Sequence, residues 1–282
     1  MSISKKVKEI IINIMTPTTL NKKLRNKEIK IWTSTDYYLS KEVLGFNRYL
    51  TPLPEKDETV IEDYEWKQYP NLLVCLDNGH ASTTPGKRSS YLCSGVLPKL
   101  ELYEYEFNRK VTAKLKEKLE KSRVTVFMVC PEVNRDIALT TRYKRANDFA
   151  EEHSELKPLL ISVHANAYGN GDAWNSARGW CAYTTKGQNN SDKLAECLYD
   201  SAEEIFIPKG MKIRKQLDDG DRDYEENFTI IWGANMPAVL TENFFYTNIE
   251  DCKYIMSDEG VEDVAEMHYR AILKFADTHY KM

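Results

Sequence analysis

The segment that decides the fold is Leu72–His80, which reads LLVCLDNGH. Its first five residues are apolar and the turn sequence Asp77–Gly79 closes them, a pattern typical of a β-strand buried on both faces. Such strands belong to parallel sheets that carry helices on either side. The segment therefore predicts the first strand of such a sheet, with His80 just beyond its carboxyl end.

Apolar runs and helical patterns alternate along the chain after this strand. The sequence predicts helices over 100–121, 138–152, 191–206 and 261–278, and strands over 124–129, 159–163, 180–184 and 237–241. Strands that are separated by helices of ten or more residues imply right-handed crossovers. We therefore expect an α/β fold with a mostly parallel sheet, helices on both faces, and an open crevice at the carboxyl ends of the strands.

The composition is that of an ordinary globular protein. The chain has 282 residues, of which 42% are hydrophobic and 29% are charged, and this excludes disordered and collagen-like chains. No run of about 18 apolar residues is present, so no membrane span is predicted. The six cysteines form no Cys-x-x-Cys pair, which favours reduced thiols over a disulfide framework or a thiolate zinc site.

The amino-terminal part of the chain differs in charge from the rest. Residues 1–50 hold ten Lys and Arg against four Asp and Glu, although the whole chain has a net charge of −4. An acidic, proline-bearing stretch at 52–58 follows, so we predict a basic extension over 1–65 and a folded domain over 66–282. A basic arm can hold an anionic polymer such as teichoic acid, but surface lysines are more often simply solvated. No nucleic-acid partner is expected.

Polar residues that follow three of the predicted strands are the first candidates for a site. His80 follows the first strand, His164 follows the strand that ends at Val163, and Glu242 follows the strand that ends at Thr241. Ligands of open α/β sheets bind at the carboxyl ends of the strands. The three side chains are therefore expected at one edge of the sheet, although they are far apart in the sequence.

A fourth candidate comes from the first predicted helix. Glu104 lies on the same helical stripe as Val111 and Leu115, which must face the sheet. An inward carboxylate needs a cation to offset the cost of its burial. Two imidazoles and one carboxylate suit Zn²⁺ and leave a fourth position for water. Glu242 would then be free to move protons during the hydrolysis of an amide.

Each of these residues has an ordinary explanation when it is taken alone. A histidine at a strand end is more often a hydrogen-bonded structural residue, and a glutamate at a helix start commonly stabilises the helix dipole. The convergence of four such residues at one edge favours a zinc site instead. The remaining histidines, His153, His268 and His279, are predicted to have surface or helix-capping roles.

Five parts of the chain carry a family pattern in addition. They are Leu76–Ala81 with Thr84–Ser89, Glu104–Asn108, Arg142–Asn147, Ser162–Ala167 and Pro237–Asn248. In this order they resemble the motifs of the zinc-dependent N-acetylmuramoyl-L-alanine amidases, a family that bacteriophage endolysins often use. The resemblance extends from residue 72 to the carboxyl end. It implies that 66–282 is a catalytic domain, with His80, Glu104 and His164 as zinc ligands and Glu242 as general base and acid.

Two positions depart from the family pattern, and one rival ligand is present. Ala81 and Phe244 stand where the family often has glycine, which bears on loop shape and substrate clearance. The rival carboxylate, Glu106, lies about 200° around the helix from Glu104 and should point away from the site.

The resemblance also implies a reaction and a substrate. The reaction is cleavage of the amide bond between N-acetylmuramic acid and L-alanine in peptidoglycan by zinc-activated water. Asn166, Tyr168 and Trp174 lie in or beside the loop after His164 and are expected to contact the substrate, although loop aromatics are as often packing anchors. Two alternatives stay open: a zinc carboxypeptidase or other amide hydrolase, and a catalytically silent protein that binds the cell wall.

The start of the sequence bears on where the protein acts. Lysines 5, 6 and 8 precede an apolar stretch, but Glu9 and Asn13 interrupt that stretch and no small-residue cleavage site follows. We therefore predict no export signal. The expectation is a protein made in the cytoplasm that acts on the cell wall after phage-mediated release.

Overall fold

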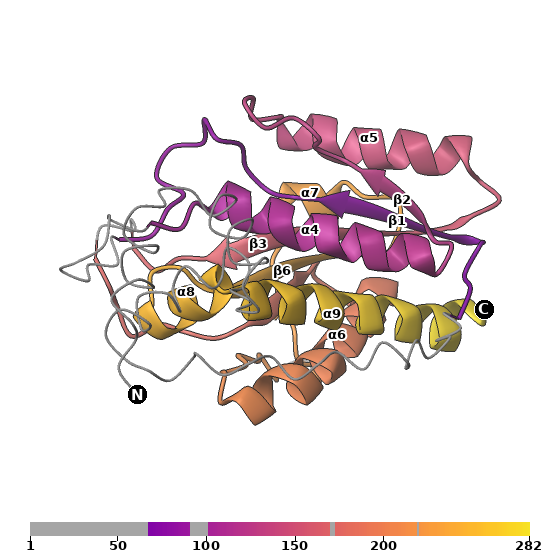
Figure 1. The fold of residues 1–282 in the computed structure, drawn as a ribbon. Helices are drawn as coiled ribbons and strands as arrows, with labels where there is room; N and C mark the ends of the chain where they lie inside the picture. The colour runs from indigo at the N-terminus through magenta and orange to yellow at the C-terminus, as the bar shows by residue number, and fades with distance from the viewer. Residues whose placement is uncertain (1–66, 91–100, 170–172, 219) are drawn as a thin grey trace, which may run out of the picture. The chain divides into compact units, whose positions relative to one another are not determined.

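The computed structural model describes residues 67–90, 101–169, 173–218 and 220–282. The predicted basic extension over 1–65 lies outside the described residues, and its role stays a prediction. The described residues form one six-stranded sheet in the order β2-β1-β3-β6-β4-β5 (Figure 1). The strands are β1 (Leu72–Asp77), β2 (Thr125–Met128), β3 (Lys157–Asn166), β4 (Cys181–Thr184), β5 (Tyr224–Glu225) and β6 (Ala238–Phe245).

The sheet is mostly parallel, as predicted. β1 pairs in parallel with β2 and β3, β3 pairs in parallel with β6, and β4 pairs in parallel with β5. β4 and β6 form the antiparallel pair. The central strands β1, β3 and β6 therefore all end at the same edge, which brings their terminal polar residues together.

Helices cover both faces of this sheet. They are α4 (Glu104–Lys121), α5 (Leu139–Glu152), α6 (Asn190–Phe206), the 3₁₀ turn η3 (Ile207–Lys209), α7 (Thr229–Trp232), α8 (Ile249–Met256), α9 (Asp258–Phe275) and the π-helical end η4 (Ala276–Tyr280). α4, α6 and α9 pack on one face, and α5 and α7 pack on the other (Figure 1). Within the described ranges, none of these helices combines the length and the apolar character that crossing a bilayer requires.

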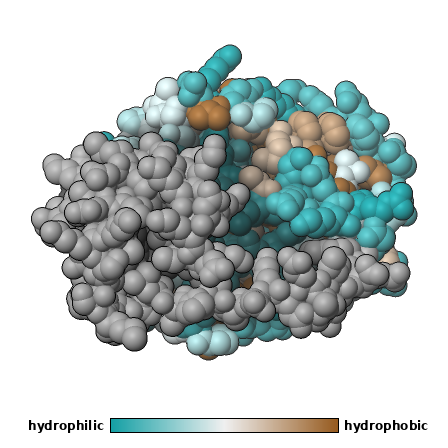
Figure 2. Space-filling model, in the orientation of Figure 1, coloured by the Kyte–Doolittle hydropathy of each residue, from teal (hydrophilic) through white to brown (hydrophobic). Residues whose placement is uncertain are grey.

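Two hydrophobic cores lie on the two sides of the sheet because successive side chains of a strand point to opposite faces. In β1, Val74 and Leu76 belong to the larger core under α4 and α9, whereas Leu73 and Cys75 belong to the smaller core under α5. All four side chains are fully buried. The described residues seen in Figure 2 present a mostly hydrophilic surface, as expected when helices turn their apolar stripes inward.

Two strands are longer than the sequence pattern predicts. β3 continues to Asn166 and β6 continues to Phe245, so His164 and Glu242 lie within strands rather than after them. The pairing of β3 with β6 persists through His164 and Glu242 and then shifts register before Asn166. Ladder hydrogen bonds therefore carry the strands past the point where their apolar runs stop.

Four short elements, β5, η3, α7 and α8, were not predicted. β5 has two residues and α7 has four, which is too short for any periodicity to show. α8 had a readable signal, because Asn248 caps it by accepting hydrogen bonds from the backbone N–H groups of Glu250 and Asp251.

His268 is a correction to the sequence analysis, which predicted a surface or capping role. It is fully buried, with Nε2 2.9 Å from Thr241 Oγ1 and Nδ1 2.7 Å from the carbonyl oxygen of Val264. The prediction was wrong because His268 shares a helical stripe with Val261, Val264 and Ile272, which face the core. Burial lowers the pKa of His268 to about 4, so the imidazole is neutral at pH 7.

Candidate active site

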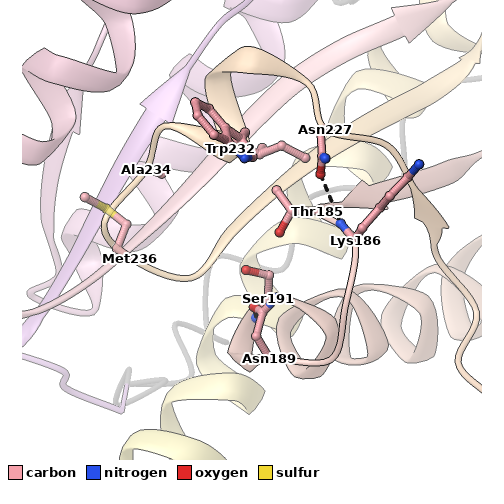
Figure 3. A pocket seen from close by; sticks show the side chains of 9 residues that line it. Thr185, Lys186, Asn189, Ser191, Asn227, Trp232, Ala234 and Met236 are labelled. Carbon is pink, nitrogen blue, oxygen red and sulfur yellow. Dashed lines mark hydrogen bonds between the residues drawn. The ribbon is translucent and has the colours of Figure 1, made fainter.

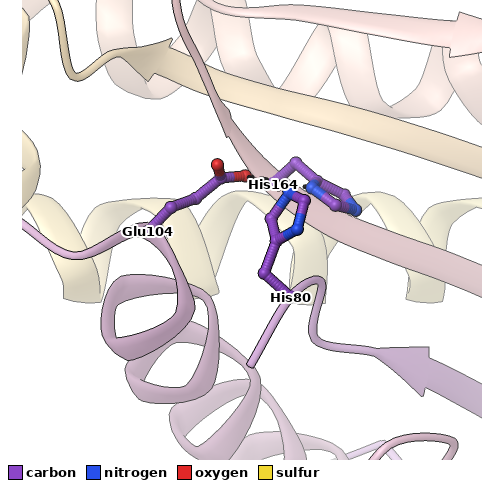
Figure 4. Close-up of side chains that lie close together, drawn as sticks. All are labelled: His80, Glu104 and His164. Atoms are coloured by element: carbon purple, nitrogen blue, oxygen red, sulfur yellow. Dashed lines mark hydrogen bonds and ion pairs between the residues drawn. The ribbon is translucent and has the colours of Figure 1, made fainter. Parts of the chain in front are cut away.

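The structure brings His80, Glu104 and His164 together at the carboxyl edge of the sheet (Figure 4). One ligand atom from each lies within 4.8 Å of the others. Glu104 Oε1 is 3.0 Å from His164 Nδ1 and 3.3 Å from His80 Nε2. The two imidazole rings stand edge to face with their centroids 4.9 Å apart. This is the convergence that the sequence analysis predicted for the proposed ligands.

His80 reaches the site through an unusual turn after β1. Gly79 has a φ of +24° and His80 has a φ of +58°, so both lie in the left-handed region. A Cβ atom at Gly79 would stand 2.4 Å from His164 Cε1 and 2.8 Å from Asn108 Nδ2. Position 79 therefore needs glycine both for its backbone conformation and for the close approach of the second imidazole.

Glu104 enters the site from the first turn of α4. Its side chain is buried, and Oε1 also accepts a hydrogen bond from the backbone N–H of Ala165 at 3.2 Å. The Nζ atom of Lys87 lies 3.6 Å from Oε2. Glu106, the rival carboxylate, is exposed and accepts a hydrogen bond from the Tyr105 hydroxyl instead. The predicted separation of the two glutamates around the helix is therefore confirmed.

The electrostatics of the three side chains suit a bound cation. Burial acts to raise the pKa of Glu104, but the hydrogen bond with His164 and the close contact with His80 hold it well below its ordinary value. The carboxylate is therefore ionised. Burial lowers the pKa of His80, which favours the neutral imidazole that a metal ligand must be. Burial also acts to lower the pKa of His164, but Glu104 raises it overall.

Two buried atoms of this group have charged neighbours but no hydrogen-bond partner in the part of the chain that the structure describes, and this observation tests the fit of a metal. Among the described residues, His80 Nε2 and Glu104 Oε2 are buried with no hydrogen-bond partner. Buried polar atoms of native proteins are normally paired, because an unpaired one costs about 1–3 kcal/mol. A cation between the imidazoles and the carboxylate would satisfy both atoms. The three residues therefore form a candidate metal site.

Glu242 lies beside this group on the neighbouring strand. It pairs in register with His164 across β3 and β6, so the two side chains leave the sheet on the same face. Its Oε2 atom is buried with no hydrogen-bond partner in the described part of the chain. Burial, with the negative charge of Glu104 adding to it, raises the pKa of Glu242 to about 7. Such a carboxyl group can exchange a proton near neutral pH.

The residues that hold the two histidines in place were not predicted. Asn243 Nδ2 donates to the carbonyl oxygen of His164 at 2.9 Å, and its Oδ1 accepts from Trp180 Nε1 at 2.9 Å. Arg109 Nη1 donates to the carbonyl oxygen of His80 at 2.9 Å. The contacts of Asn243 and Arg109 with the histidine carbonyl groups have no signal in the sequence, since each joins a side chain to the backbone of a distant segment.

Asp77, at the end of β1, ties three elements together next to the site. It is fully buried and accepts hydrogen bonds from Ser162 Oγ at 2.7 Å and from Arg142 Nη1 at 3.1 Å. Both partners lie in segments that carry the family pattern, which was the available signal for this contact. The bonds fix the edge of the sheet from which His80 departs.

The two departures from the family pattern fit the structure. Phe244 has a φ of +69°, the left-handed conformation that glycine adopts most easily. Its ring is fully buried, and the packing on Phe206 and Tyr254, at centroid distances of 4.9 and 5.3 Å, offsets the cost of that conformation. Ala81 is buried and its backbone N–H donates to Thr84 Oγ1 at 2.9 Å.

The three predicted substrate contacts lie in different environments. Tyr168 is 67% exposed just beyond the end of β3. Trp174 is partly buried and packs against the larger core. Asn166 Oδ1 accepts a hydrogen bond from the backbone N–H of Ala167 at 2.8 Å. Residues 170–172 of the same loop lie outside the described residues.

Two of the cavities on the described surface differ in their position relative to the site. One, of about 310 Å³, adjoins the candidate metal site through Lys87 and is lined by the loop 82–88 together with Tyr103 and Tyr105. The other, of about 380 Å³, lies beyond the opposite end of β6 and includes Lys186, Asn227 and Trp232 (Figure 3). The first therefore borders the candidate site, and the second does not.

Known proteins resemble this chain in sequence and in fold. A sequence profile of the N-acetylmuramoyl-L-alanine amidases matches residues 74–274. The endolysin of Bacillus phage SPP1 is 25% identical over 213 residues, which cover 74% of this chain and 68% of the endolysin.

Solved structures share the fold. An N-acetylmuramoyl-L-alanine amidase from Clostridium difficile 630 matches with a TM-score of 0.60 and 24% identity, covering 75% of this chain and all of that chain. Another, from Nostoc punctiforme, matches with a TM-score of 0.57 and 22% identity, covering 73% and 98%. With the profile match across most of its length, the chain belongs to the N-acetylmuramoyl-L-alanine amidase family and is a peptidoglycan amidase.

Proposed function

We propose that this amidase works with one zinc ion held by His80, Glu104 and His164, and that Glu242 moves the protons of the reaction. The observation that carries the proposal is the convergence of two imidazoles and an ionised carboxylate. Two buried atoms of this group, His80 Nε2 and Glu104 Oε2, have no hydrogen-bond partner within the described ranges. Two nitrogens and one oxygen are a usual donor set for a catalytic zinc ion, with a fourth position left open.

The metal ion and Glu242 would have different roles in the proposed reaction. When bound, zinc would supply an activated water and polarise the carbonyl group of the scissile amide. Glu242 accepts a proton as the water oxygen bonds to the carbonyl carbon, and then gives it to the nitrogen of L-alanine as the carbon–nitrogen bond breaks. With a cation bound beside it, the pKa of Glu242 would fall, and the ionised carboxylate could accept that proton at neutral pH.

The reaction products test the proposal against its alternatives. Digestion of defined peptidoglycan should release stem peptides that begin with L-alanine, a chelator should stop the release, and one equivalent of zinc should restore it. Mass analysis of the fragments and the metal content per chain provide the measurements. Release of carboxyl-terminal amino acids alone would support a carboxypeptidase, and wall binding without any fragments would support a catalytically silent protein. Activity that survives complete metal removal would contradict the zinc assignment.

We propose that the residues around the loop after β3 contact the substrate, with Tyr168 as the main aromatic surface. Tyr168 follows the strand that carries His164, and its exposed ring is available to stack on sugar or peptide. Asn166 and Trp174 stay in the proposed contact region, although Trp174 also serves the packing of the core.

Tyr168→Ala should raise KM for peptidoglycan about fivefold and change kcat little, because an exposed stacking contact contributes about 1 kcal/mol to binding. Steady-state kinetics and a melting curve measure both effects. Trp174→Ala is the matched aromatic comparison, and it should lower the melting temperature as well, since its ring packs on the core. An unchanged KM in the Tyr168 variant would remove this residue from the substrate site.

The cell wall is the proposed place of action. The relative from Bacillus phage SPP1 is an endolysin, and this chain shares its sequence over most of both lengths. We propose that this chain likewise reaches peptidoglycan after release from the cell that makes it, with residues 66–282 as the catalytic domain.

A further inference from the structure

A second group of convergent side chains lies outside the candidate active site. Asp192 is in the first turn of α6, and Asp221 and Asp223 precede β5. One carboxylate oxygen from each lies within 4.8 Å of the others. Thr184, the last residue of β4, places its hydroxyl between two of them. None of these residues takes part in the proposed amidase reaction.

The cluster contains a buried carboxylate that is incompletely paired. Asp223 is 0% exposed, and its Oδ2 atom is 2.5 Å from Thr184 Oγ1. Its Oδ1 atom is buried and has no hydrogen-bond partner among the described residues. The unpaired oxygen belongs to one of the three carboxylates that converge. A buried oxygen without a donor needs a proton or a cation.

The single hydroxyl proton of Thr184 also indicates that the cluster needs an additional proton or a cation. Its hydroxyl is buried and lies 3.0 Å from Asp192 Oδ1 as well as 2.5 Å from Asp223 Oδ2. A hydroxyl has one proton and can donate it to only one of the two carboxylates. The other contact then sets two lone pairs against each other, unless that carboxylate carries a proton or both oxygens bind a cation.

The nearby arginine does not neutralise the two buried carboxylates, Asp192 and Asp223. Arg222 is next in sequence to Asp223, but its guanidinium pairs with Glu196, Asp200 and Glu203. Asp192 Oδ2 accepts a hydrogen bond from the backbone N–H of Asn189, which is a neutral donor. Burial, with the charges of Asp221 and Asp192 adding to it, raises the pKa of Asp223 to about 7. The repulsion that a cation would relieve is therefore substantial.

We propose that Asp192, Asp221 and Asp223 bind a Ca²⁺ ion that stabilises the fold. The ligands are all oxygens, which hard divalent cations prefer, and the Thr184 hydroxyl adds a further oxygen beside them. Ca²⁺ accepts variable geometry more readily than Mg²⁺, which suits carboxylates from a helix and a loop. The ion would join the start of α6 to the segment before β5 and to the end of β4.

Melting of the zinc-loaded full chain tests this site without relying on amidase activity. Relative to its value in calcium-free buffer, the melting temperature should rise by about 5 °C when 1 mM CaCl₂ is added. This is the shift expected for a ligand well above its Kd. Asp223→Asn should be more stable than the wild type without calcium, because it removes one buried charge, and should not respond to calcium. Asp218→Asn, which changes an exposed neighbour outside the cluster, should respond as the wild type does.

Calorimetric titration of the zinc-loaded wild type needs no variant and should give one Ca²⁺ per chain. The absence of calcium binding at millimolar concentration would overturn the proposal and assign the unpaired oxygen to a shared proton. An equal calcium response in Asp223→Asn, or a response to MgCl₂ with none to CaCl₂, would also overturn it. Because the active site keeps its zinc throughout, failure here leaves the proposed amidase mechanism unaffected.

Discussion

Glu242→Gln should reduce kcat for peptidoglycan hydrolysis by about 10²–10⁴-fold, the range that general acid–base catalysis contributes. Glutamine keeps the size of the side chain but can neither accept the proton of the attacking water nor return it to the leaving nitrogen. Glu242 is the titratable group with a pKa near 7 that lies in register with His164. Fragment release from defined peptidoglycan measures the rate.

The variant should keep its zinc and its stability, and these two measurements separate catalysis from folding. Glu242 is placed beside the ligands rather than among the three atoms that converge, so metal content should stay near one ion per chain. Replacing a buried, unpaired carboxyl group by an amide should not lower the melting temperature. Glu226→Gln, at an exposed glutamate, is the matched control and should have normal activity. A Glu242→Gln enzyme that digests the wall at the normal rate would refute the proposed mechanism.

The parts of the fold that could be predicted from the sequence are those in which burial is continuous. In β1, residues 72–76 are apolar because both faces of the strand are covered, and the pattern is readable without the structure. The stripe of α4 that runs from Glu104 to Leu119 is buried along its length, so the inward direction of the Glu104 carboxylate was predicted correctly. The candidate site was predictable because the buried strands are parallel, and the carboxyl ends of parallel strands lie at one edge of the sheet.

What could not be predicted depends on contacts between distant segments. The left-handed backbone at Phe244 is maintained by aromatic packing on α6 and α8, and no local sequence pattern predicts this packing. His268 was misassigned because its polar neighbours along the chain concealed an inward stripe. The Asp192, Asp221 and Asp223 cluster joins a helix start to a loop about thirty residues later, and neither segment has a spacing that marks a cation site.

Glu104→Gln should remove the bound metal and, with it, amidase activity. The amide oxygen of glutamine is neutral and a weaker ligand for zinc than a carboxylate, and its NH₂ group would face the two imidazoles. Loss of a residue that merely supports a ligand costs about 10–100-fold in metal affinity, so loss of a ligand should cost at least about 100-fold. Competition with a coloured chelator measures the zinc affinity, and fragment release measures the activity.

Glu106→Gln is the matched control, because both glutamates lie in the first turn of α4 and interact alike with the helix dipole. Glu106 is exposed and points away from the site, so its variant should keep zinc and activity. Equal zinc affinity in the two variants would show that Glu104 is not a ligand, whatever its effect on stability. A loss confined to Glu104→Gln, with a melting temperature close to that of the control when zinc is absent from both, can arise only from the metal site.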